Sequence, residues 1–196
     1  MILRCNDKIL VLEKTQINFS KNNLHSIFRT KNNKTLGETL DHPKYKSLKE
    51  EFEKYQKSHF EKPLGKFLYN LKKSSNTKYL KFLNKHGDNI FCEFNIETNL
   101  EDKGIYAWVV EDEIKYIGRC TDNFKKRVNQ GYGRINAKNC YRDGQSTNCH
   151  LNSKINECKN VDFYVYKMNE KTTIEINNLE FEILKSQNFE WNIQNN

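Results

Sequence analysis

Two tyrosines in a predicted β-hairpin are the first residues whose types and spacing suggest chemistry. Tyr106 stands near the start of the apolar run 104–110, and Tyr116 stands in a second run that follows the acidic segment 111–113. β-Branched and aromatic residues on both sides of a short polar connection are typical of antiparallel strands joined by a turn. The two hydroxyls can therefore lie on one face, where they can orient or deprotonate a water if neighbouring cations lower their pKa below about 10.

A glycine stands at each end of this hairpin. Because glycine has no Cβ, Gly104 and Gly118 are expected to leave room for a phosphate or another backbone segment to approach closely. The triplets Gly104-Ile105-Tyr106 and Tyr116-Ile117-Gly118 resemble the signature of the GIY-YIG nuclease family. The resemblance covers about residues 104–192, because further family positions follow in order: a basic residue, an arginine on the first helix, a glutamate on the last helix and a later asparagine. Those positions hold Arg119, Arg127, Glu180 and Asn192.

The resemblance implies hydrolysis of a phosphodiester bond with the help of one divalent cation. Glu180 is the expected ligand of Mg²⁺, with waters completing the octahedron. Arg127 suits a non-bridging phosphate oxygen, and Arg119 is expected to be a second clamp. Tyr106 is the expected general base. Asn192 is expected to tie down the end of the chain by hydrogen bonding.

One position departs from the family's pattern. Several members place a histidine or tyrosine four residues after the helix arginine, where this chain has Gly131. Tyr132, one residue later, is one candidate to supply that group. His150, at the start of a later predicted helix, is the other.

Basic and amide-bearing residues around the hairpin are expected to contact DNA, because such groups bind phosphates and base edges. In the segment 139–149 they can equally hold a loop together through Asx and Ser/Thr turns. The expected DNA contacts are Lys125, Lys126, Arg134, Asn139, Arg142, Gln145 and Asn148.

The overall charge also favours a polyanionic partner. The 196 residues carry a formal charge of +8, and segment 44–85 holds twelve lysines but only four glutamates. Such a run is either a solvated helical face or a surface that follows phosphates. The nuclease motif downstream favours the second interpretation.

The sequence predicts a protein of the cytoplasm without a membrane partner. No apolar run approaches the roughly 20 residues that span a bilayer, and the N-terminus lacks the apolar segment of a signal peptide. Cys140, Cys149, His150 and Cys158 lie close in sequence, but no paired ligand spacing supports a zinc site, so reduced thiols are expected.

The predicted fold is α+β: a small three-stranded antiparallel sheet flanked by helices, preceded by a basic and mainly helical region. The domains are expected to be residues 1–100 and 101–196. In the first, helices are expected over 43–59, from Pro63 and near Tyr79. Elsewhere the patterns predict strands at 8–13, 90–96 and 161–166, helices at 150–157 and 173–185, and a long loop at 134–149. A further helix through 124–128 is expected, with Thr121-Asp122 as its N-cap and an end near residue 131.

The expected function is a Mg²⁺-dependent endonuclease of double-stranded DNA, of the type II restriction kind, acting as a homodimer so that both strands are cut. One alternative is a nicking nuclease of repair, phage or mobile-element type. Another is a nucleic-acid-binding module with an idle site, although the retention of Glu180, Arg127 and both hairpin tyrosines argues against it.

Overall fold

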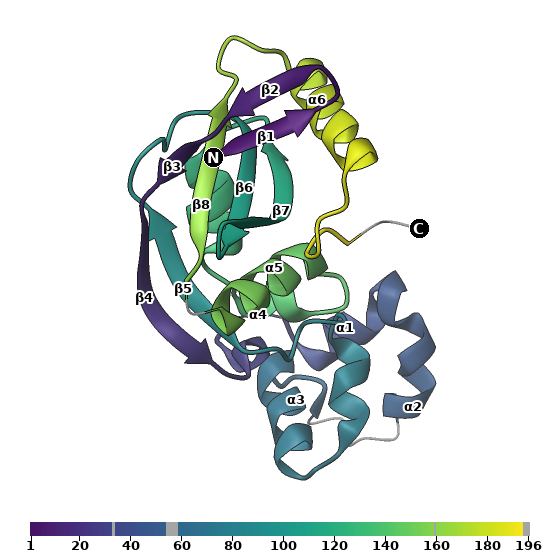
Figure 1. Ribbon diagram of the computed structural model, residues 1–196. Coiled ribbons are helices and arrows are strands. Elements are labelled where there is room, and N and C mark those ends of the chain that lie inside the picture. Colours follow the sequence, from purple (N-terminus) through teal and green to yellow (C-terminus); the bar gives the residue numbers. More distant parts are fainter. Residues whose placement is uncertain (33, 54–58, 159, 194–196) are drawn as a thin grey trace. The chain divides into compact units, whose positions relative to one another are not determined.

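The computed structural model describes residues 1–32, 34–53, 59–158 and 160–193 and has the expected α+β class (Figure 1). The chain divides into two compact units. Unit 1 contains Met1–Asn22, Cys92–Arg134 and Lys154–Asn196, and unit 2 contains Asn23–Phe91 and Ile135–Ser153. The units are thus interleaved along the chain, and the expected boundary near residue 100 falls inside unit 1. Among the described residues, none of the helices has both the length and the apolar character needed to cross a bilayer.

Unit 1 is built on a four-stranded antiparallel sheet of order β3-β8-β6-β7. The strands are β3 (Glu13–Thr15), β6 (Gly104–Val110), β7 (Glu113–Cys120) and β8 (Asp162–Lys167). Three of them are the expected strands. The fourth, β3, pairs with β8 and satisfies backbone groups that would otherwise form an open edge, so the expected count of three strands is wrong.

The hairpin between β6 and β7 turns through two residues, Glu111 and Asp112, whose φ angles are 50° and 64°. Positive φ at both central positions is the geometry of a type I′ turn, which matches the twist of the flanking strands. The resulting register places Tyr106 opposite Gly118 and Ile105 opposite Arg119. Because side chains alternate between faces, Tyr106 and Tyr116 lie on the same face, as the sequence predicted.

The two faces of this sheet carry different cores. One face holds an aromatic cluster and is flanked by the π-helix Lys125–Tyr132, whose N-cap is Phe124 rather than the expected Thr121-Asp122. The cluster is Tyr106, Trp108, Phe124, Tyr132 and Phe163. The other face packs against α6 (Thr173–Ser186) and the hairpin of β1 (Ile2–Cys5) and β2 (Lys8–Val11). Ile176, Leu179 and Ile183 of α6 are buried there.

Unit 2 is mainly helical and has its own core. Its helical segments are η1 (Ile27–Arg29), α1 (Leu36–Asp41), η2 (Pro43–Leu48), α2 (Lys49–Glu53), α3 (Leu64–Lys73), η4 (Thr77–Phe82), α4 (Ala137–Cys140) and the start of α5 (Ser146–Glu157). The predicted helices beginning at Pro43, Pro63 and near Tyr79 are confirmed in the part of the chain described, whereas residues 54–58 of the first lie outside it.

Three expectations from the sequence are corrected. The long loop predicted at 134–149 contains α4, because Asn136 and Asn139 form a capping box, and α5 begins at Ser146 rather than His150. The strand predicted at 90–96 is confirmed as β5 (Phe91–Ile96), which pairs with β4 (Ile17–Leu24) in a separate two-stranded sheet. The first 24 residues are largely strands, so only the part after them is mainly helical.

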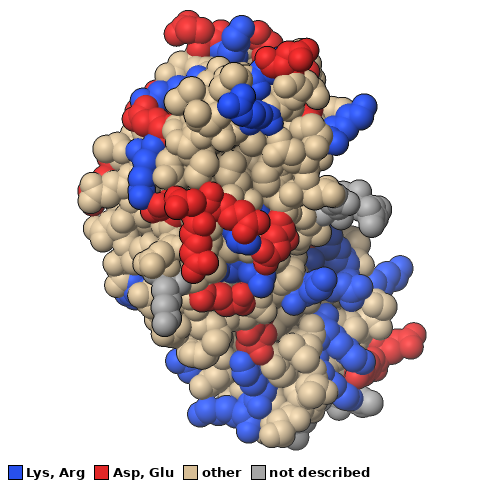
Figure 2. Space-filling model, in the orientation of Figure 1, with Lys and Arg blue, Asp and Glu red and all other residues tan. Residues whose placement is uncertain are grey.

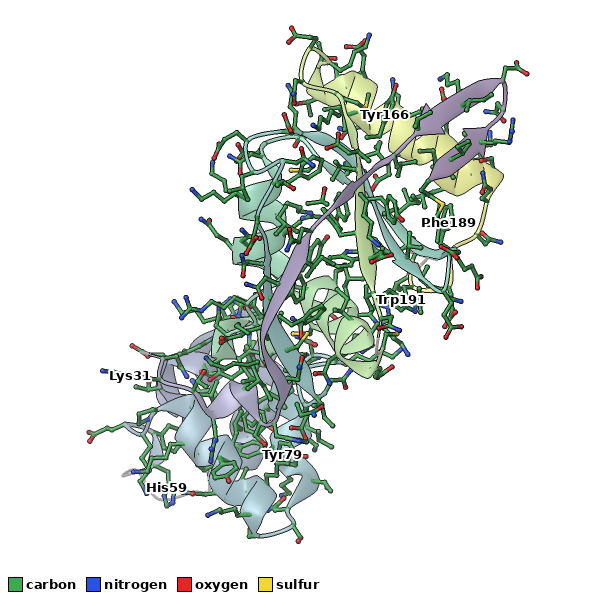
Figure 3. All side chains as sticks on the ribbon, turned by 60° about the vertical axis from the view of Figure 1, so that its left-hand side comes forward. Lys31, His59, Tyr79, Tyr166, Phe189 and Trp191 are labelled. Carbon is green, nitrogen blue, oxygen red and sulfur yellow. The ribbon has the colours of Figure 1, made fainter. Side chains whose placement is uncertain are left out.

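The segment after α6 fastens the free edge of β7. The backbone N–H of Trp191 donates to the carbonyl of Lys115 at 2.8 Å. The side chain of Asn192 accepts from the N–H of Ile117 at 2.9 Å and donates to its carbonyl at 2.8 Å, which is the tie expected of this residue. Trp191 and Phe189, both labelled in Figure 3, are buried in this segment.

Replacing Asn192 with alanine removes both hydrogen bonds to Ile117 and leaves two backbone groups of an edge strand without protein partners. We expect Asn192→Ala to lower the free energy of unfolding by about 1–3 kcal/mol. Asn178→Ala is the matched control, because Asn178 lies exposed on α6. Urea denaturation followed by circular dichroism measures both, and equal midpoints for the two variants would contradict the tie.

Candidate active site

A pocket of about 470 Å³ opens in unit 1 where β7 ends. It is lined by Arg119, Cys120, Thr121, Asp122, Asn123, Lys126, Arg127 and Glu180. Arg119, Arg127 and Glu180 are residues that the sequence predicted for the site, and they come from three separate elements. Asp122, two residues after the end of β7, was predicted only as part of a helix cap, and its place in the pocket lining was missed.

The sheet topology explains why these side chains meet. Because β7 is an edge strand, elements on its two faces can both reach past it. Arg127 comes from the π-helix on the aromatic face, and Glu180 comes from α6 on the opposite face. Arg119 is on β7 itself, directly opposite Ile105.

Glu180 forms an ion pair with Arg119 across the pocket. Arg119 Nη1 donates to Glu180 Oε2, and the side chains are 45% and 12% exposed, respectively. The guanidinium thus covers the carboxylate that was expected to bind a metal, while much of its own surface faces solvent. At the pocket rim, Lys126 pairs with Asp122 at 2.7 Å between two exposed side chains.

A hydrogen-bonded group of tyrosines lies behind Arg127. Arg127 Nε donates to Tyr106 Oη at 3.2 Å, and the hydroxyls of Tyr106 and Tyr132 share a hydrogen bond of 2.6 Å. The Arg127 guanidinium also lies over the Tyr132 ring, with 5.0 Å from Cζ to the ring centroid. Tyr116 stacks beside Tyr106 with 6.0 Å between centroids. These contacts hold the position of an arginine that is itself exposed.

Burial keeps the hairpin tyrosines neutral. Desolvation raises the pKa of Tyr106 well above its ordinary value, and it raises the pKa of Tyr116 as well. The charge of Arg127 lowers both, but it does not offset the cost of burying a phenolate. The net change is upward, so the condition for Tyr106 to act as a general base, a pKa lowered below about 10, is not met in this structure.

Of the two candidates for the group that follows the helix arginine, Tyr132 and His150, the structure brings Tyr132 next to Arg127. In a π-helix the hydrogen bond runs from residue i+5 to residue i rather than from i+4, so each turn holds an extra residue. The N–H of Gly133 accordingly donates to the carbonyl of Val128 at 2.7 Å. This wider turn brings Tyr132 beside Arg127. The other candidate, His150, belongs to unit 2, where its ring lies 4.7 Å from that of His86.

Gly118 provides the space in which the tyrosine rings pack. A Cβ at this position would lie 2.5 Å from Cζ and Oη of Tyr106 and 2.7 Å from Cε1 of Tyr116. The room expected here for a phosphate is therefore filled by the tyrosines. At Gly104, where φ is +142°, a Cβ would lie 2.1 Å from the carbonyl oxygen of Tyr166, so a backbone does approach closely there.

The remaining predicted DNA contacts fall into two groups. Asn139 and Asn148 both donate to Gln145, at 3.3 and 2.5 Å, so these three side chains hold the turn between α4 and α5, which was the alternative left open for that segment. Lys125, Lys126, Arg134 and Arg142 are exposed and accessible to a ligand.

Comparisons with models of known protein families, with curated proteins and with solved structures found no match to this chain. In the described part of the chain, no three or more His, Cys, Asp or Glu side chains are grouped so that they could hold a metal ion by themselves.

The packing of the tyrosines over Gly118 gives the first prediction for this site. Gly118→Ala inserts a methyl group into occupied space, so we expect a loss of about 1–3 kcal/mol in the free energy of unfolding. In the control Gly37→Ala, on α1, the nearest contact of the added methyl would be 3.3 Å, and a smaller effect is expected. Thermal unfolding distinguishes them, and an undiminished stability of Gly118→Ala would contradict the packing.

The raised pKa of Tyr106 gives a second prediction. The native state favours the protonated hydroxyl, so its contribution to stability is intact below the unfolded pKa of about 10 and is lost as the pH rises further. We expect the free energy of unfolding to fall above about pH 10 and to fall less steeply in Tyr106→Phe. Urea denaturation at pH 8 to 11 checks this, and parallel curves would refute it.

Proposed function

We propose that this chain is a Mg²⁺-dependent endonuclease that hydrolyses phosphodiester bonds of double-stranded DNA. The observation that carries the proposal is the pocket at the end of β7, where Arg119, Arg127 and Glu180 meet. Two guanidinium groups and one carboxylate suit a reaction in which negative charge develops on phosphoryl oxygens. The likeness of the hairpin to GIY-YIG nucleases supports the same chemistry.

The two arginines would bind the scissile phosphate. A guanidinium presents its donors in a planar fork that matches the oxygens of a phosphate. Both arginines line the same pocket and both are exposed, so an anion can reach them from solvent. Tyr106 and Tyr132 act as positioning residues, because their hydrogen bonds fix the orientation of Arg127.

The residues of the pocket fit Mg²⁺ on the condition that Arg119 moves away from Glu180. This cation binds through one or two carboxylates and keeps several waters, and Glu180 and Asp122 supply carboxylates to the same pocket. Arg119 must first leave Glu180, which its large exposed fraction permits when a phosphate offers a competing anion. A bound cation would neutralise phosphoryl charge and lower the pKa of a coordinated water.

The pairing of Arg119 with Glu180 also favours a second candidate function. A module that binds nucleic acid without cleaving it needs no metal, and in such a protein the ion pair would persist. Within the nuclease proposal, a restriction-type enzyme acting as a homodimer would cut both strands. A nuclease of repair, phage or mobile-element type would nick one.

Cleavage of supercoiled plasmid tests the proposal. Glu180→Gln keeps the size of the side chain but removes its charge, so we expect cleavage in Mg²⁺ to fall about 100-fold or more. Glu182→Gln is the matched control two residues along α6, where Glu182 pairs with the surface residue Lys8. Chelation of Mg²⁺ should abolish cleavage.

The products identify the kind of enzyme. Discrete fragments from the wild-type protein indicate site-specific cutting of both strands, and open circles indicate nicking. Binding of plasmid without any cleavage in Mg²⁺ would overturn the nuclease proposal in favour of the binding module.

A further inference from the structure

The net positive charge of the chain comes from unit 2. This unit contains 17 of the 33 lysines and arginines but only 8 of the 25 aspartates and glutamates, which gives it a formal charge of +9 and leaves −1 for unit 1. On the face that Figure 2 shows, Lys and Arg side chains are frequent over the helical part of the molecule that forms unit 2. The pocket therefore lies in a unit with little net attraction for a polyanion, and the other unit must supply most of it.

Helix α3 of this unit is amphipathic. Its inner face buries Leu64, Phe67, Leu68 and Leu71 in the core of unit 2. The exposed face carries Lys66, Asn70 and Lys73, which are spaced at i, i+4 and i+7 and so lie along one side of the helix. The apolar side chains of α3 are thus buried in the core, and the three polar side chains of its outer face are exposed to solvent.

The two lysines of this outer row differ in their ion pairing from their neighbour Lys72. Within the described part of the chain, neither Lys66 nor Lys73 has a carboxylate within 4.0 Å. By contrast, their neighbour Lys72 points to the side of the helix and pairs with Asp88 at 2.6 Å. The charge of the row is therefore available to an external anion.

A tyrosine beside the row holds a further cation in place. The guanidinium of Arg29 lies over the ring of Tyr69, 4.5 Å from its centroid, and the ammonium of Lys73 lies 5.3 Å from the same centroid. Arg29 comes from η1 and is exposed. Two segments distant in sequence thereby present one cationic surface around α3.

We propose that the outer face of α3, formed by Lys66, Asn70 and Lys73, enters the major groove of double-stranded DNA. The inference takes its ligand from the proposed function but needs no catalysis. A helix of ten residues is about 15 Å long, and the major groove is wide enough to admit it. An asparagine between two lysines can combine contacts to base edges in the groove with contacts to the phosphates on either side of it.

Each residue has a distinct task in this arrangement. The Asn70 amide can pair with both N6 and N7 of an adenine, and a lysine can donate to O6 and N7 of a guanine or to a phosphate. Arg29, held against Tyr69, reaches phosphates at the edge of the groove. The α3 face thus reads or grips the duplex, and the pocket of unit 1 cleaves it.

Binding without cleavage tests the inference directly. Fluorescence anisotropy with a mixed-sequence duplex, in EDTA, compares wild type with Lys66→Ala/Asn70→Ala/Lys73→Ala. We expect binding to weaken about tenfold or more, and the slope of log K against log salt to fall by about 2. The matched control, Lys14→Ala/Asn178→Ala/Lys185→Ala, removes the same residue types from exposed positions of unit 1 and should retain wild-type affinity.

A second measurement needs no variant. Substituting 7-deazapurines removes the N7 acceptors from the major groove only, so wild-type binding should weaken. A ligand that fills the minor groove should leave it unchanged. Insensitivity to 7-deazapurines, or equal weakening by the two triple variants, would overturn the inference.

The outcomes separate this inference from the proposed nuclease. A protein that cleaves plasmid, and whose α3 variant binds and cleaves like wild type, refutes the role of α3 alone. Binding that depends on α3 in a protein that never cleaves refutes the nuclease alone. A wild-type protein without affinity for duplex DNA refutes both.

Discussion

The candidate site depends on one cross-strand pair, Tyr106 opposite Gly118. In an antiparallel pair, the side chain of one strand occupies the space over its partner, and here that space exists only because the partner has no Cβ. A slip of one residue would turn Tyr106 to the face of α6 and remove its hydroxyl from Arg127. The two triplets of the hairpin are therefore a single packing unit, and their spacing is set by the length of the turn.

The place of the pocket depends on which part of the β7 edge is covered by other segments. The C-terminal segment covers this edge at Lys115 and Ile117, where Trp191 and Asn192 satisfy its backbone groups. Two residues further on, at Arg119, the pocket begins. Elements from both faces of the sheet reach this end, so an arginine of the aromatic face and the glutamate of α6 can line one cavity.

Local patterns predicted the parts of this arrangement that local forces determine. The hairpin followed from alternation around a polar turn, and α6 followed from its 3.6-residue period. The pairing of β3 with β8 could not be found in this way, since three residues of ordinary composition joined a strand far along the chain. The interleaving of the units could not be predicted either, because it also depends on contacts between segments that are distant in sequence. The raised pKa of Tyr106 could not be predicted from the sequence, because it results from burial of the side chain in the packed fold.

The offset at Tyr132 shows how backbone geometry can correct a mismatch in sequence. Counted on an α-helix, the tyrosine stands one residue too far from Arg127 to share its face, and the sequence therefore left His150 as an alternative. The π-helix adds one residue per turn, which makes i+5 equivalent to i+4, and the guanidinium then lies over the Tyr132 ring. Such wide turns are rare in proteins and are frequently found at functional sites. This helix holds both Arg127 and Tyr132, the hydroxyl partner of Tyr106. A shift of its register would move the guanidinium of Arg127 away from the Tyr132 ring.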